Sequence, residues 1–184
     1  EGSDPELLRT LLALYRKVGE HQSVLKTYDR LADFGDIETA RVMVMEKARY
    51  AREVGRDGEA LETLERLLSV ESDIDASKLV GEILYDNERW TELVAALKRR
   101  LHRTEETSER IAIRQAISSV QFEKLGAAGP AAEGVREILA SDPGNDAARK
   151  MGQKLATMQD HPDYGEFAPA LLTEMETAFR TDDP

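Results

Sequence analysis

Four short stretches of the sequence decide the fold: GEHQSV at residues 19–24, GRDGEA at 55–60, ERWTEL at 88–93 and GAAGPA at 126–131. Each stretch opens at a helix-ending position and has a small or aliphatic residue five positions later. The openings are Gly19, Gly55, Glu88 and Gly126, and the followers are Val24, Ala60, Leu93 and Ala131. The openings lie 36, 33 and 38 residues apart. This period predicts stacked helical hairpins, because one hairpin cannot bury its apolar face alone.

The residues around these stretches predict an all-α fold. Apolar side chains recur at helical spacing, and the chain has no proline from Glu6 to Gly129, so helices can run unbroken there. We expect one domain over residues 1–184, made of about five antiparallel helix hairpins. The approximate hairpin units are residues 4–36, 37–72, 73–105, 106–143 and 144–181.

Composition narrows the classes of function. The net charge of −11 argues against nucleic-acid binding, which depends on Lys and Arg neutralising phosphates. No apolar run approaches the roughly 20 residues that span a bilayer, so we expect no membrane segment. Cysteine is absent, which favours a cytoplasmic location and leaves an exported one open.

The chain opens with Glu1 instead of methionine and closes on Pro184. We therefore expect it to be a segment of a longer, bacterial protein. An anchor or a catalytic domain could lie outside this segment.

The repeats resemble the tetratricopeptide (TPR) family, whose unit of 34 residues is two antiparallel helices. The positions that carry the resemblance on first helices are Leu11, Leu12, Tyr15, Val80, Gly81, Leu84 and Phe122. Those on second helices are Tyr28, Ala60 and Ala131, with Pro143 as the terminal proline. Lys47, Ser118 and Ser119 depart from the pattern, standing where apolar or small residues are usual. The resemblance covers roughly residues 4–160.

The resemblance implies a right-handed α-solenoid whose concave face, formed mainly by first helices, binds a peptide or a protein surface. It implies no chemistry and no cofactor. The sequence is thus interpreted as a non-catalytic scaffold or adaptor with a protein or peptide partner. The alternative is a regulatory or substrate-recruiting segment of a larger enzyme or signalling protein whose active site lies elsewhere.

The first two repeats contain the candidate binding residues. With the TPR phasing, the concave face carries a basic cluster of Arg9, Arg16, Lys17, Met45, Arg49 and Arg52. Residues 1–54 hold 10 acids and 9 bases, whereas residues 160–184 hold 7 acids and 1 base, so the charge is polarised. The basic cluster could attract an acidic peptide. The alternative is a solvated face whose bases pair with Glu6, Glu20, Glu46 and Glu53.

Two apolar features can each be interpreted in two ways, as part of the packed core or as a surface that binds a partner. The last helix carries the stripe Phe167, Leu171, Met175 and Phe179, which either caps the array or forms a docking surface for a further repeat. An exposed stripe there would allow self-association through the last helix. Trp90 is either a packing wedge at a hairpin corner or a contact for a partner.

Catalytic signatures are weak. His21, His102 and His161 lie 81 and 59 residues apart, with no further ligand at metal-binding spacing. The run from Gly126 to Pro130 lacks the Lys-Ser/Thr pair of a phosphate loop. We therefore predict no enzyme activity, no metal and no cofactor.

Overall fold

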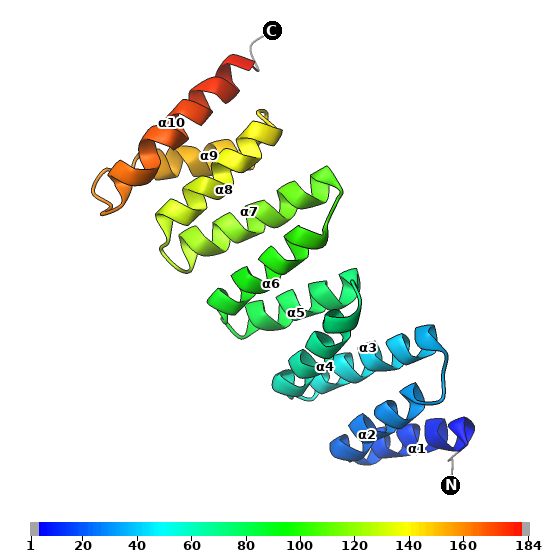
Figure 1. Cartoon of the computed structure of the whole chain (residues 1–184). Coiled ribbons are helices and arrows are strands. Elements are labelled where there is room, and N and C mark those ends of the chain that lie inside the picture. Colours follow the sequence, from blue (N-terminus) through cyan, green and yellow to red (C-terminus); the bar gives the residue numbers. More distant parts are fainter. Residues whose placement is uncertain (1–3, 182–184) are drawn as a thin grey trace. The chain divides into compact units, whose positions relative to one another are not determined.

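A computed structural model describes residues 4–181, and within this range the chain forms ten α-helices and no strand (Figure 1). The first five helices are α1 Pro5–Val18, α2 His21–Ala32, α3 Ile37–Glu53, α4 Asp57–Val70 and α5 Ile74–Asp86. The others are α6 Trp90–Arg103, α7 Thr107–Glu123, α8 Ala128–Ser141, α9 Asp146–Ala156 and α10 Tyr164–Thr181. In chain order the ten helices can be counted as five consecutive pairs. The all-α repeat architecture is confirmed.

The four helix-ending positions have the backbone conformation that the repeat predicts. Gly19, Gly55 and Gly126 have φ values of 76°, 73° and 63°, and Glu88 adopts the same left-handed region with φ of 56°. The followers are buried: Val24, Ala60 and Ala131 are 0% exposed and Leu93 is 4% exposed. Helices α1, α3, α5 and α7 therefore each end in a left-handed residue, and the helix that follows each of them returns with a small or aliphatic side chain turned into the core.

Side-chain oxygens begin several of the helices. Asp36 accepts a hydrogen bond from the Thr39 N–H at 2.8 Å, and Asp73 accepts one from the Ala76 N–H at 2.8 Å. Asp4 performs the same function for α1, where Pro5 occupies the first turn. These caps satisfy N–H groups that have no partner within the helix, so they fix where α1, α3 and α5 start.

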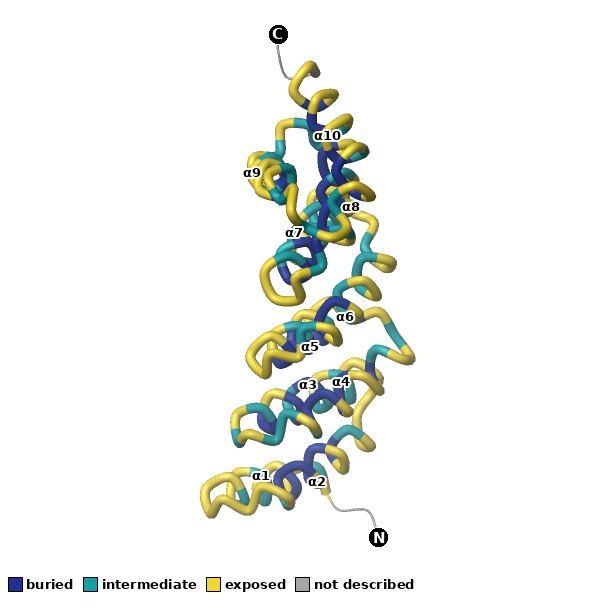
Figure 2. The backbone as a smooth tube through the Cα atoms, turned by 90° about the vertical axis from the view of Figure 1, so that its left-hand side faces the viewer, coloured by how far each residue is buried: buried dark blue, intermediate teal, exposed yellow. Residues whose placement is uncertain are grey.

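The chain divides into two compact units, Glu1–Asn87 and Glu88–Pro184. The division falls inside the predicted third hairpin, between α5 and α6. In the first unit each helix packs on the next along the chain, from α1 to α5. The tubes of α3 and α4 carry dark-blue buried stretches, whereas α1 is mostly exposed and buries only Leu8 (Figure 2).

The second unit contains α6 to α10 and has its densest core among the last three helices. There α8 contacts α7, α9 and α10, and α10 also contacts α9. Val135, Leu139, Leu155 and Leu171 are 0% exposed in this core. The small residues Ala131, Ala132 and Gly152 let these helices approach one another closely: a methyl group at Gly152 would lie 2.9 Å from the Met175 sulfur.

Candidate interaction surfaces

Two arginines of the basic cluster, Arg16 and Arg52, make ion pairs between successive first helices of the first unit. Arg16 on α1 contacts Glu53 on α3 at 3.2 Å. Arg52 stands at the corresponding place on α3, three residues before the left-handed position, and contacts Glu82 at 2.7 Å and Asp86 at 2.6 Å on α5. All five side chains are partly exposed, so each pair contributes at most about 1 kcal/mol. The pairs neutralise the charge that an acidic partner would otherwise meet.

The remaining members of the basic cluster differ in environment. Arg49 pairs with Glu46 on its own helix at 2.8 Å. Met45 is 5% exposed and belongs to the core of the first unit. Arg9 and Lys17 on α1 are exposed and make no ion pair with any residue between 4 and 181. The structure therefore brings Arg16, Arg49 and Arg52 next to acids, among them Glu46 and Glu53, and leaves two bases open to solvent.

Arg16 also covers an aromatic cluster between α2 and α3. Its guanidinium lies 4.8 Å from the centroid of the Tyr50 ring and donates to the Tyr28 hydroxyl at 3.4 Å. The His21 Nδ1 and the Tyr50 hydroxyl are hydrogen-bonded at 2.7 Å. Burial raises the pKa of the Tyr28 phenol, which keeps it protonated at neutral pH, and Tyr50 is only 5% exposed. The arrangement packs α2 against α3.

Two buried charges of the first unit are paired across helices. Lys47, a departure from the TPR pattern, contacts both oxygens of Asp29 on α2 at 2.6 and 2.8 Å. Arg41 on α3 contacts Asp73 at 2.5 Å. Burial acts to raise the pKa of Asp73, but hydrogen bonds from the Ala76 N–H and the Arg41 guanidinium hold it below its ordinary value. The buried charges of Lys47 and Asp73 are thus each paired with an opposite charge on a neighbouring helix.

The stripe on the last helix is largely a core feature. Leu171 is fully buried, Phe167 and Met175 are 8% and 7% exposed, and all three join the cluster with α8 and α9. These three residues therefore match the interpretation in which the stripe caps the array, and they do not form an exposed docking surface. Phe179 is the exception at 46% exposure, with the Arg149 guanidinium 4.9 Å from its ring centroid.

In the second unit the contact face of α7 is polar where α5 is apolar. Counted from the left-handed position, Ser118 and Gln121 lie eight and five residues before it, the places that Val80 and Ile83 occupy on α5. Ser118 and Gln121 are nevertheless buried, at 1% and 7% exposure. The Ser118 hydroxyl is buried and has no hydrogen-bond partner, whereas buried polar groups are normally satisfied. The Gln121 side chain makes no hydrogen bond to the residues that the structure describes, and its amide is not fully enclosed.

A cleft opens beside these residues, formed by α6, α7 and α8, with a volume of about 310 Å³. Gln121, Ser118 and Ile117 line it from α7, and Lys98 and His102 line it from α6. On the α8 side it is lined by Pro130, Glu133, Gly134 and Glu137. Its size is at the lower end of the range for ligand pockets.

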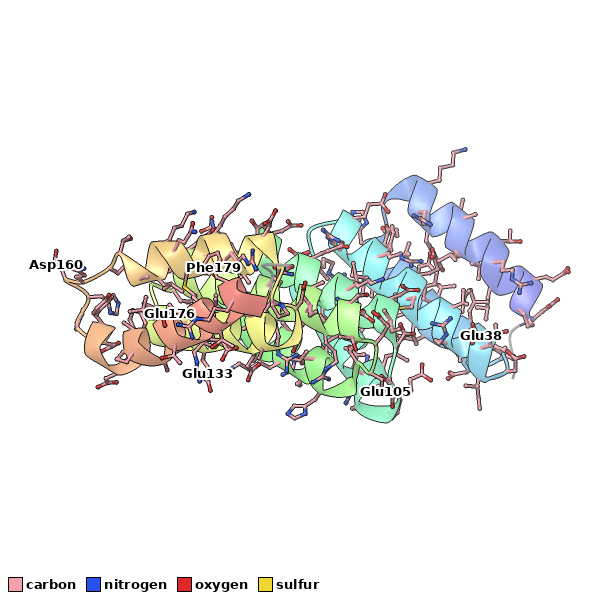
Figure 3. The ribbon with its side chains drawn as sticks, turned by 90° about the horizontal axis from the view of Figure 1, so that it is seen from above. Glu38, Glu105, Glu133, Asp160, Glu176 and Phe179 are labelled. Atoms are coloured by element: carbon pink, nitrogen blue, oxygen red, sulfur yellow. The ribbon has the colours of Figure 1, made fainter. Side chains whose placement is uncertain are left out.

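Opposite charges line the two walls of the cleft. Lys98 and His102, one turn apart on α6, form the basic wall; Glu133 and Glu137 form the acidic wall on α8, from which Glu133 projects in Figure 3. Arg114 on α7 contacts Glu137 at 2.6 Å. Within residues 4–181, Lys98, His102 and Glu133 make no ion pair.

Sequence reasoning did not find this cleft, although it contained the signal. Ser118 departs from the TPR pattern, and the buried position of Gln121 follows from the same register. What the pattern could not supply was the separation of α6 from α7 and α8, which depends on the volumes of several side chains. The register of the left-handed residues would have placed Gln121 beside Ser118.

The other predicted features have ordinary structural surroundings. Trp90 opens α6, is half-buried, and has the Lys124 ammonium 5.0 Å from its ring centroid. Across the described part of the chain, no three His, Cys, Asp or Glu side chains gather closely enough to hold a metal ion. No helix among these residues has the length and apolar character needed to cross a membrane.

Comparisons with known proteins support the fold. The sequence matches no protein-family model, and no curated protein sequence is significantly similar to it. Among solved structures, MamA of strain AMB-1 superposes with a TM-score of 0.51 at 14% identity, covering 96% of this chain and 92% of that chain. A double mutant of MamA from RS-1 gives 0.50 at 14% identity, with 100% and 99% covered. A further MamA crystal structure gives 0.50 at 14% identity, with 98% and 96% covered.

MamA is a TPR-like protein, and the likeness extends over nearly the whole of both chains. At 14% identity it shows the fold alone. The chain therefore has a TPR-type helical repeat fold, as its sequence predicts.

Proposed function

We propose that this chain is a non-catalytic protein-interaction scaffold that binds an extended segment of a partner protein in the cleft between α6, α7 and α8. The observation that carries the proposal is the pair of polar side chains on the cleft wall, Ser118 and Gln121: the Ser118 hydroxyl is buried without a partner, and Gln121, 7% exposed, makes no hydrogen bond to residues 4–181. If this position served only to pack α7 against its neighbours, an apolar residue would be expected here. Ile83 is the apolar residue at the equivalent position on α5. A polar side chain kept at this position fits a binding role.

The chemistry of the cleft fits a peptide. A glutamine amide both donates and accepts, so it can form two hydrogen bonds with the peptide groups of an extended chain. Lys98 and His102 on one wall would attract an acidic side chain, and Glu133 on the other would attract a basic one. A segment with charges of both signs would therefore bind in one direction only.

Selection of a displayed random-peptide library on the 184-residue chain tests the proposal. We expect enriched peptides to carry an acidic and a basic residue flanking a short central segment. Gln121→Leu should weaken their binding at least about tenfold, since a buried hydrogen-bonding pair is worth about 1–3 kcal/mol. Leucine is close in size to Ile83, which stands at the same repeat position on α5, so the substitution should not unfold the protein.

Lys154→Glu on α9 is the matched control, because Lys154 is exposed and lies outside the cleft. It changes the net charge without changing the cleft and should leave the affinity unchanged. Peptides that bind wild type and Gln121→Leu equally well would place the binding site elsewhere.

The basic cluster supplies a second candidate site for the same function. Arg9 and Lys17 are exposed and make no ion pair within the described range, so they remain available to an acidic segment. If this site binds, Arg9→Glu with Lys17→Glu should abolish binding of selected acidic peptides, while Gln121→Leu should leave it intact. The two sites are thus separable by one pair of variants.

A further inference from the structure

The first helix carries two apolar faces, and only one of them is covered. Leu8 is fully buried against the rest of the first unit. Leu7, Leu11, Leu14 and Val18 form a second stripe at spacings of four, three and four residues, which places them on one side of the helix. Leu7 and Leu14 are each 52% exposed and Val18 is 60% exposed. We call these four residues the α1 stripe.

The residues at the equivalent repeat positions in later helices show that the position of Leu14 is normally covered. Leu14 lies five residues before the left-handed Gly19. The residues at the same place in the next two first helices are Tyr50 on α3 and Ile83 on α5, and they are 5% and 0% exposed. The same position is therefore covered in both later first helices of the unit and uncovered in α1.

A second helix of the preceding hairpin provides this cover. Tyr50 on α3 contacts α2 through His21 and Tyr28, and Lys47, three residues earlier, contacts Asp29 on α2. The corresponding cover for Leu14 would be a helix that presents an apolar face as α2 does. The α1 stripe is thus one half of the contact by which the hairpins of this fold stack.

The last helix presents the other half. On α10, which is itself the second helix of its pair, Leu172 is 41% exposed and Phe179 is 46% exposed, two turns apart. The Arg149 side chain of α9 contacts the Phe179 ring and leaves about half of this residue open to solvent. Glu176 lies between Leu172 and Phe179 in the sequence and is labelled together with Phe179 in Figure 3. These three residues form the α10 face.

The charges of the two helices are complementary. Helix α1 has one acid and three bases, whereas α10 has three acids and one base. Lys17 flanks the α1 stripe, and Glu176 lies within the α10 face. From these matching positions and charges we infer that copies of this chain associate head to tail, with the α10 face of one copy covering the α1 stripe of the next.

Such a contact joins different surfaces of the two copies, so wild type should form assemblies larger than dimers whose mean mass rises with concentration. Sedimentation velocity on the whole 184-residue chain measures this. Leu14→Glu disables the α1 stripe and Leu172→Glu disables the α10 face; both residues are about half-exposed, so both variants should fold, which circular dichroism checks. Each variant alone should be monomeric at concentrations where wild type associates.

An equimolar mixture of the two variants is the decisive sample. The α10 face of Leu14→Glu and the α1 stripe of Leu172→Glu are both intact, so the mixture should form dimers with one copy of each and nothing larger. Ile37→Glu, which changes an 84% exposed apolar residue on α3, should associate like wild type.

Three results would overturn the inference. A dimer of Leu172→Glu alone would indicate a symmetric α1 contact, and a dimer of Leu14→Glu alone would indicate a symmetric α10 contact. Wild type that stays monomeric up to about 1 mM, where even weak complexes form, would show that copies of this chain do not cover these faces.

Discussion

At the scale of single residues, Glu88 occupies a backbone conformation that favours glycine. Its φ of 56° matches the three repeat glycines, and a left-handed residue with a side chain costs about 1–2 kcal/mol. Glu88→Gly should therefore stabilise the fold by about 0.5–1 kcal/mol, after subtracting the greater entropy that glycine loses on folding. Urea denaturation of both proteins measures the difference.

Gly55→Ala provides the opposite test. A methyl group added to Gly55 would meet no atom within 4 Å, so its effect reports the backbone alone. We expect a loss of about 1 kcal/mol. If Glu88→Gly destabilised the protein as much as Gly55→Ala does, Glu88 would contribute contacts that outweigh its conformation.

Asp73 should make stability depend on acid pH. Its folded pKa lies below the ordinary value of 3.8, so the unfolded chain binds the proton more tightly. Asp73 then contributes stability above about pH 4, and this contribution is lost as pH falls through the folded pKa. Asp73→Asn keeps the helix cap but removes the charge that pairs with Arg41.

We expect Asp73→Asn to cost about 1–3 kcal/mol at pH 7 and less at pH 3, as measured by denaturant unfolding at both values. Glu38→Gln is the control, because Glu38 contacts the same Arg41 guanidinium from the surface. A penalty that is equal at both pH values would show that lost packing is responsible.

At the scale of elements, α7 and α8 are held at a distance set by two small residues. A methyl group built on Gly134 would lie 2.2 Å from the Ser118 hydroxyl oxygen and 3.5 Å from the Ser118 Cβ. Gly134→Ala alone should destabilise by about 1–3 kcal/mol, because the helices must shift to relieve the overlap. Ser118→Ala alone should be neutral or stabilising, since it removes a buried hydroxyl without a partner.

The double variant Ser118→Ala with Gly134→Ala should recover most of the loss, because only an ordinary contact with Cβ remains. A double-mutant cycle from thermal unfolding measures the coupling. Additive effects of the two substitutions would mean that the Ser118 hydroxyl moves aside at little cost.

The same elements show how far the sequence could predict the structure. The helix pairs follow from local chemistry, because Gly19, Asp36 and Asp73 end or start helices through their own backbone and side chains. The partners of Arg16 and Arg52 were only partly predictable: Glu53 was among the expected acids, whereas Glu82 and Asp86 come from a helix about 30 residues on. Whether the last stripe was core or surface depended on the fit of Leu171 against α8, which periodicity does not determine.

At the scale of the whole molecule, the array should open from its first helix. Only Leu8 of α1 is buried, whereas α3 and α4 bury five residues each. Local opening is easiest where few apolar contacts are lost, so α1 amides should exchange with solvent faster than those of α3 and α4. Hydrogen-exchange mass spectrometry at low concentration, where copies are separate, measures this order.

Raising the protein concentration should then slow exchange in α1 without slowing it in α3 or α4. Head-to-tail association covers Leu7, Leu14 and Val18, so opening α1 would also have to break the contact with the next copy. Leu14→Glu removes this coupling, and its α1 should exchange at one rate whatever the concentration. Equal concentration dependence in wild type and Leu14→Glu would mean that association, where it occurs, protects α1 through some other surface.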